Sequence, residues 1–196
     1  MEQAIKHVID LSAVPDQFPT HRHKSEFWEK LGRIVATFGF LEETLGKAIF
    51  AFAATRPYSE KEVLKAYEDW LPNLERALYD QLGNLIEAYG KAVRDHPNAT
   101  IENLDELLCK LKAASKIRNV ICHGSWGPPD SEGASLPFFV SRQMERFETP
   151  IDTQYLIQLQ RHVSELICTV ICTVTHIGWQ FPGSHGPGKP IWESGD

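Results

Sequence analysis

The 196-residue chain lacks the short motifs that identify most cofactor-dependent enzymes. It contains no phosphate-binding P-loop, no glycine-rich dinucleotide fingerprint and no His-Glu-x-x-His zinc motif. Its four cysteines form no Cys-x-x-Cys pair, which argues against a zinc knuckle or a thiol–disulfide centre. Cys168 and Cys172 lie one helical turn apart, a spacing that fits half of a metal site, but small reduced core residues are the favoured interpretation. We therefore expect neither a cofactor nor a metal ion.

Long apolar runs and an excess of positive charge are also missing. No run approaches the roughly 18 apolar residues of a membrane span. The first ten residues lack the basic-then-apolar order of a secretory signal, so we expect a cytoplasmic protein with no membrane segment. The formal net charge of -6 argues against non-specific coating of nucleic acid, although it is compatible with a local basic pocket that admits one phosphate.

The sequence does contain strong helical periodicity. Apolar residues recur at steps of three and four over several long segments, which is typical of helices that bury one face. Start signals accompany them: a capping box at residues 59–62, Pro72 in a first turn, Thr100 as a cap, and Asp152 or Thr153 as another. These signals predict an all-α fold, a bundle of four to five helices at residues 26–54, 59–70, 72–93, 100–122 and 153–180.

Three segments fall outside the helical pattern. Residues 1–25 form a lead-in, and residues 181–196, rich in glycine and proline, are expected to be a flexible tail. Between them, residues 124–150 predict a small loop or β-hairpin excursion inside the domain of residues 26–180, with strands near residues 137–140 and 145–149. The second half of the last helix is apolar on nearly every side, so it is either wrapped by the bundle or faces a partner subunit.

The sharpest chemical feature lies at the end of the fourth predicted helix. Stepping 100° per residue from Leu104 places Arg118 on the apolar stripe of that helix. A buried arginine is costly without partners, so Arg118 must be paired, open to a cleft, or at a subunit interface. Asn119 lies beside the stripe, and His123 is about 140° round from Arg118. The two side chains converge only if the helix unwinds near Gly124 or if two subunits pool their copies.

The segment Arg118-Asn119-Val120-Ile121-Cys122-His123 resembles the Arg-polar-x-x-x-His signature of the HEPN superfamily (higher eukaryotes and prokaryotes nucleotide-binding domains). Arginine and histidine at such a spacing recur by chance, so the weight rests on the polar second residue, the helix-terminal position and the glycine that follows. The resemblance covers residues 26–180 in architecture but only residues 115–126 in sequence. It implies an all-α, commonly dimeric protein from a family with many metal-independent ribonucleases, several of them toxins or antiphage effectors, and also non-catalytic members.

The resemblance gives each residue a role. His123 would be the general base that takes the proton of a ribose 2′-hydroxyl, and Arg118 would stabilise the charge that develops on the phosphorus oxygens. Asn119 would orient the phosphate or the histidine. Trp126 would stack on a base, although a half-buried hairpin aromatic is the favoured role for it. In the structural alternative, Arg118 pairs with a core carboxylate and His123 caps the helix end.

Three functions therefore stay open: a metal-independent endoribonuclease of toxin or defence type, a non-catalytic module that binds RNA or a nucleotide, and a dimeric scaffold. The first implies a homodimer and an antitoxin or other regulatory partner. The basic patch at residues 21–24 adds a second candidate for phosphate contact, with a solvated arm as its favoured interpretation.

Overall fold

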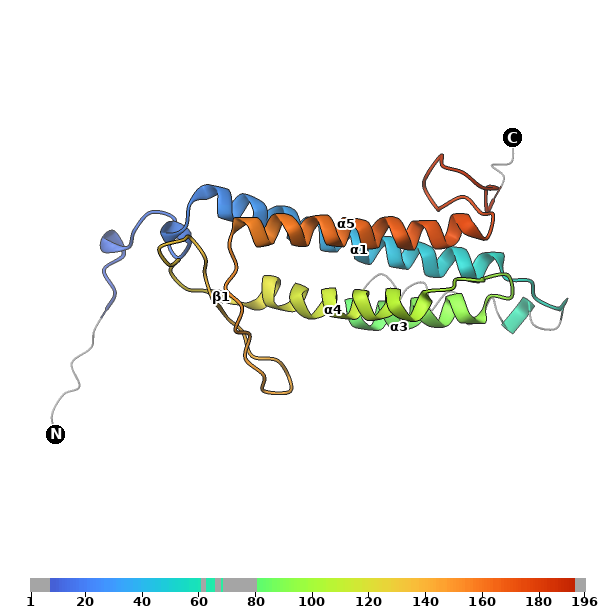
Figure 1. The fold of residues 1–196 in the computed structure, drawn as a ribbon, viewed down its shortest axis with the longest axis horizontal. Coiled ribbons are helices and arrows are strands. Elements are labelled where there is room, and N and C mark those ends of the chain that lie inside the picture. The colour runs from blue at the N-terminus through green and yellow to red at the C-terminus, as the bar shows by residue number, and fades with distance from the viewer. Residues whose placement is uncertain (1–7, 61–62, 66–67, 69–80, 193–196) are drawn as a thin grey trace.

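The computed structural model describes residues 8–60, 63–65, 68 and 81–192. Helices account for 59% of the structure and strands for 6%, which confirms the predicted all-α class. The long helices are α1 (Ser25–Thr55), α3 (Leu82–Asp95), α4 (Leu104–His123) and α5 (Thr153–His176), and they run side by side along one axis (Figure 1). Within the described ranges, none of the helices is both long enough and apolar enough to cross a membrane.

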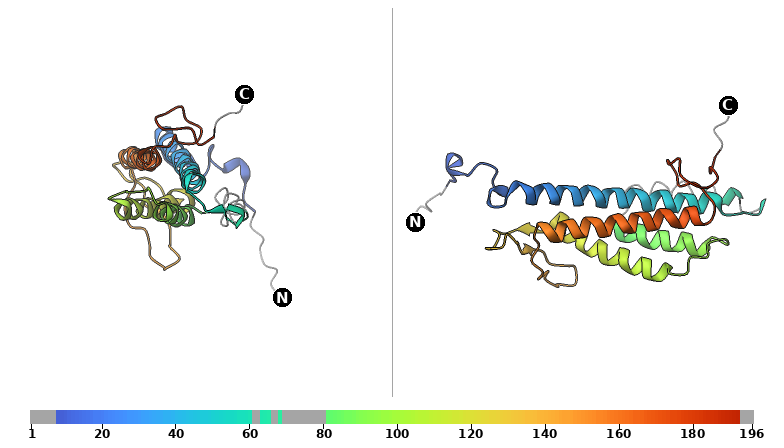
Figure 2. Two further views of the ribbon diagram at one scale, coloured as in Figure 1. Left: turned by 90° about the vertical axis from the view of Figure 1, so that its right-hand side faces the viewer. Right: turned by 45° about the horizontal axis from the view of Figure 1, so that its top comes forward.

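The helices form two layers, α1 with α5 and α3 with α4 (Figure 2). A single apolar stripe of α1 supplies much of the core between them: Phe27, Ile34, Phe38, Leu41, Leu45 and Phe52. Burying each such side chain contributes about 1.5–3 kcal/mol, so this stripe orders the bundle. A buried hydrogen bond of 2.9 Å between the hydroxyls of Tyr89 and Thr173 ties α3 to α5.

Both predicted limits of one helix and the predicted start of another are confirmed. Helix α1 begins and ends within one residue of the expected range. Helix α5 begins at Thr153 because Asp152 Oδ1 accepts the backbone N–H of Tyr155 at 2.6 Å. It ends at His176, four residues before the expected limit, because Gly178 adopts a φ of 90° that few other residues tolerate.

One predicted helix is interrupted, and the predicted start of another is wrong. The helix expected at residues 72–93 is not continuous: α3 begins at Leu82, because Gln81 is extended, with φ -64° and ψ 147°. The expected start at Pro72 lies outside the described residues. Helix α4 begins at Leu104 after Asn103, not after Thr100, and Ile101 packs against the core in the non-helical segment between them. The apolar stripes continue in phase across both breaks, so periodicity alone could not locate them. Half of the predicted helix at residues 59–70 lies outside the described residues, and so do the stripe residues Leu74 and Leu78.

The excursion before α5 holds a small antiparallel sheet, and its main pairing differs from the prediction. Strand β1 (Ser125–Trp126) follows α4 at once and pairs with β2 (Pro137–Phe138). The predicted partner segment makes only an isolated bridge, Val140 with Arg146, supported by the hydrogen bond from Phe147 N–H to Phe139 O at 3.1 Å. The pairing of β1 with β2 holds the end of α4 against the excursion.

Two further expectations need correction. Residues 181–192 of the expected flexible tail form a loop that turns back on α1, with Phe181 buried and Trp192 5.8 Å from the ring of Phe50. Cys168 and Cys172 are exposed rather than in the core, and both are unbridged. On α5 they lie about 140° and 180° from Val163 on the buried stripe, on the opposite face. The bundle therefore does not wrap the second half of α5.

Candidate functional site

The Arg118–His123 segment forms the last turns of α4, at the end of the bundle where β1 begins (Figure 1). The helix does not unwind before Gly124: His123 is still helical, and the N–H of Gly124 donates to Val120 O at 2.8 Å. A Cβ on Gly124 would lie 2.6 Å from Val120 O and 3.0 Å from Pro137 Cβ. The glycine therefore permits the sheet to pack closely against the helix end.

Arg118 is paired within the chain, the first of the three possibilities left by its position. Its Nη2 lies 3.3 Å from Glu42 Oε1 on α1, and the two side chains are 27% and 28% exposed. That carboxylate oxygen is itself buried and accepts no hydrogen bond from the described residues, so the contact is ionic without hydrogen-bond geometry. Arg118 Nη1 also donates to Asn119 Oδ1 at 3.5 Å, the weak limit of a hydrogen bond.

His123 differs from Arg118 in having an unengaged side chain. It is exposed, and its imidazole makes no hydrogen bond or ion pair with the rest of the described chain. Because α4 remains helical, His123 and Arg118 leave the axis about 140° apart. A single chain therefore does not bring the two side chains together, and pooling of two subunits is the condition that stays open.

Glu42 and Cys122 belong to the site, although the sequence did not identify them. Burial raises the pKa of the Cys122 thiol, the charge of Arg118 lowers it, and the charge of Glu42 raises it again. These three side chains thus form one electrostatic cluster between α1 and α4. The pairing of Glu42 with Arg118 depends on packing between helices that are far apart in sequence, so no local pattern could have shown it.

Trp126 is half-buried in β1, and its ring lies edge-on to Phe27 with the centroids 5.1 Å apart. This contact anchors the sheet to the start of α1. The favoured role of a hairpin aromatic therefore has direct support, and base stacking by Trp126 remains a prediction.

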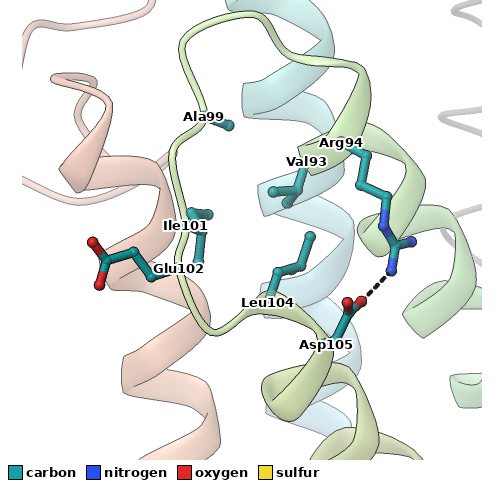
Figure 3. A pocket seen from close by; sticks show the side chains of 7 residues that line it. All are labelled: Val93, Arg94, Ala99, Ile101, Glu102, Leu104 and Asp105. Atoms are coloured by element: carbon teal, nitrogen blue, oxygen red, sulfur yellow. Dashed lines mark hydrogen bonds and ion pairs between the residues drawn. The ribbon is translucent and has the colours of Figure 1, made fainter.

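A separate cavity of about 260 Å³ lies where α3 ends and α4 begins. Figure 3 shows the ion pair between Arg94 and Asp105, 2.6 Å long, at its edge. No residue of the Arg118–His123 segment lines this cavity. Within the described ranges, no group of three or more histidine, cysteine or acidic side chains is placed to hold a metal ion.

Comparison with known proteins found no match among protein-family models, curated proteins or solved structures.

Proposed function

We propose that the chain is a HEPN-like module that cleaves single-stranded RNA without a metal ion, in a site completed by two copies. The observation that carries this proposal is the exposed, unengaged imidazole of His123 on the same helix end as the partly exposed Arg118. A proton acceptor and a fixed positive charge are the two groups that cleavage through a ribose 2′-hydroxyl requires.

The reaction balances with these groups alone. His123 takes the proton of the 2′-hydroxyl, and the 2′-oxygen forms a bond to phosphorus while the bond from phosphorus to the 5′-oxygen breaks. Arg118 stabilises the negative charge on the phosphoryl oxygens, and Asn119 holds the guanidinium or the phosphate in place. The leaving 5′-oxygen is protonated by water or by a second His123. The products are a 2′,3′-cyclic phosphate and a 5′-hydroxyl.

A second copy supplies what the geometry of one chain lacks. Because Arg118 and His123 diverge on α4, Arg118 of one copy and His123 of the other must line a common groove. The exposed face of α5, which carries Cys168 and Cys172, offers one surface for such association. An enzyme that cuts RNA needs restraint in the cytoplasm, so a regulatory partner of antitoxin type belongs to this proposal.

One observation favours a second candidate function, a dimeric scaffold. The contact between Arg118 and Glu42 joins α4 to α1, which is what a purely structural arginine would do. In that case Arg118 stabilises the bundle, and the exposed His123 has no chemical role.

The test is to incubate purified protein with mixed single-stranded RNA in EDTA and to analyse the ends of the fragments. We expect cleavage that leaves 2′,3′-cyclic phosphate and 5′-hydroxyl ends. Intact RNA after incubation with clean protein, or fragments with 3′-hydroxyl ends, would reject the nuclease and leave the binding or scaffold function.

A further inference from the structure

The segment at residues 20–24, here called the basic arm, is docked on the bundle rather than extended into solvent. It contains the short helix η2 (Thr20–Arg22) and leads into α1. The indole N–H of Trp28 donates to Thr20 O at 2.8 Å, a partly buried hydrogen bond. The ring of His23 stacks on Phe27, with centroids 4.5 Å apart and planes inclined by 24°. Two independent contacts therefore fix the arm against the first turn of α1.

The same contacts place the basic arm beside the end of α4. Phe27, on which His23 stacks, also lies edge-on to Trp126 of β1 at 5.1 Å. Trp126 follows His123 by only three residues. Figures 1 and 2 both show η2 and the excursion that begins with β1 at one end of the bundle. A continuous row of aromatic rings thus connects the arm to the segment that carries the candidate general base.

The arm presents positive charge that the described chain does not neutralise. Arg22 and Lys24 are exposed and form no ion pair with any described residue. Most basic side chains on the bundle helices do pair with acids, as in Lys30, Arg33, Lys47, Arg94, Lys110, Lys112 and Arg118. The acid nearest in sequence is Glu26, which lies in the first turn of α1 where the helix dipole stabilises it.

His23 serves as an anchor rather than as a third positive charge. Both of its ring nitrogens are buried and have no hydrogen-bond partner in the described chain. Burial lowers the pKa of His23, which favours the neutral ring. Because this ring stacks on Phe27, it anchors the backbone between the two flanking cations, Arg22 and Lys24.

We propose that Arg22 and Lys24 bind the phosphate backbone of single-stranded RNA on its way to His123, an inference that rests on the proposed function. Proteins that track single strands combine positive charge with aromatic side chains that stack on bases. The arm supplies the charge and the half-buried Trp126 a ring, whereas Phe27 is buried and only connects the two. Because the whole chain carries a net charge of -6, a local pair of unneutralised cations marks where a polyanion can approach.

The test measures binding, not cleavage, in a His123→Ala background. A fluorescein-labelled single-stranded RNA is titrated by anisotropy at several salt concentrations against the parent, Arg22→Ala/Lys24→Ala, and Lys91→Ala/Lys189→Ala. The control pair removes the same charge from exposed positions outside the arm. Each contact with a single-strand phosphate adds about 0.7 to the slope of log K against log salt, so the arm variant should lose about 1.4 of slope. At about 0.1 M salt its affinity should fall roughly ten- to thirtyfold, while the control changes little.

The outcomes separate the two proposals. If the parent binds RNA and the arm variant binds with the same affinity and slope, the arm inference is overturned and the nuclease proposal is untouched. Equal losses of RNA affinity in the arm and control variants would mean that only the total charge matters, which also overturns the arm inference. A parent that binds no RNA overturns both proposals. Circular dichroism checks the fold, which these exposed substitutions should leave unchanged.

Discussion

Three of the long helices end at or directly before a histidine, and two of these histidines, His96 after α3 and His123 of α4, differ in almost every respect. His96, the cap of α3, is 3% exposed; its Nε2 lies 3.2 Å from Thr55 Oγ1, and its Nδ1 accepts the N–H of Asn98 at 3.3 Å. His123, at the end of α4, is exposed and makes no such contact within the described chain. A helix-terminal histidine therefore stabilises the fold at one end of the molecule, whereas at the other end it is exposed and unengaged by the described chain.

The arginine near each histidine differs too. Arg94 and Asp105 form a short ion pair of 2.6 Å, but their side chains are 52% and 89% exposed, so solvent screens the pair. The pair of Arg118 with Glu42 is longer, at 3.3 Å, and closer to the interior. The buried carboxylate oxygen of Glu42 accepts no hydrogen bond from the described part of the chain, so charge attraction alone holds Arg118 to it.

Replacing His123 should have the largest effect on function. His123→Ala should reduce the RNA cleavage rate by about 10²–10⁴, the usual contribution of a general base. His162→Ala, which removes another exposed histidine from α5, should leave the rate unchanged. Cleavage rates with end-group analysis provide the measurement. Equal activity in the two variants would erase the functional difference between the two helix ends.

Arg118→Ala should reduce cleavage by about 10²–10³, and Arg94→Ala should not reduce it. The substitution at Arg118 also leaves the buried oxygen of Glu42 without its counter-charge, so thermal melts must accompany the assay. The double variant Glu42→Gln/Arg118→Ala removes that charge and should recover stability without recovering cleavage. Recovery of cleavage together with stability would assign Arg118 to the scaffold.

For stability we expect the reverse: replacing His96 should have a larger effect than replacing His123. His96→Ala removes a buried ring that bonds to Thr55 and Asn98, and should lower the free energy of unfolding by about 1–3 kcal/mol. His123→Ala should change it by less than about 0.5 kcal/mol, as is usual at exposed sites. Urea denaturation measures both. A His123→Ala variant as unstable as His96→Ala would show that His123 is structural.

The smallest expected effect concerns pH. Burial lowers the pKa of His96, hydrogen bonding to the backbone of Thr55 raises it, and the charge of Arg56 lowers it further. A folded-state pKa below the unfolded value means that the unfolded chain binds more protons. Stability should therefore be fully present above about pH 6.5 and fall as the pH drops through the folded-state pKa of His96. His23, whose pKa burial also lowers, adds to the same loss.

His96→Gln should flatten this pH dependence in part, and His123→Ala should keep the wild-type slope. The measurement is the free energy of unfolding in urea between pH 5 and pH 8, with pH values chosen on both sides of the usual histidine pKa of about 6.5. Identical slopes in wild type and His96→Gln would mean that burial does not control the protonation of His96.

The sequence predicted what depends on local signals. The stripe of α1 and the cap at Asp152 are properties of neighbouring residues, so the limits of α1 and the start of α5 followed from them. The start of α3 could not be predicted in this way, because the apolar periodicity of the sequence continues across Gln81, where the backbone is extended. The exposure of Cys168 and Cys172 could have been predicted from helical geometry, since both lie opposite the buried stripe of α5.

The candidate site was predictable only in outline. Helical geometry predicted that Arg118 needs a partner and that it diverges from His123, and α4 keeps that divergence. The partner, Glu42, comes from a helix far away in sequence, and its choice depends on tertiary packing. The contacts that dock the basic arm join residues only four and eight positions apart, His23 with Phe27 and Thr20 with Trp28, and the favoured interpretation of a solvated arm missed them. Only the contact of Phe27 with Trp126, which connects the arm to β1, is long-range.

The most direct test of a shared site is to mix two inactive variants. Arg118→Ala and His123→Ala protein are combined in equal amounts, unfolded and refolded together, and assayed for RNA cleavage. A mixed dimer holds one intact Arg118 and one intact His123 on different copies, so random pairing should restore about a quarter of the wild-type activity. Each variant refolded alone stays inactive. If the mixture cleaves no more RNA than the separate variants, although light scattering shows dimers, the site is not completed by a second copy.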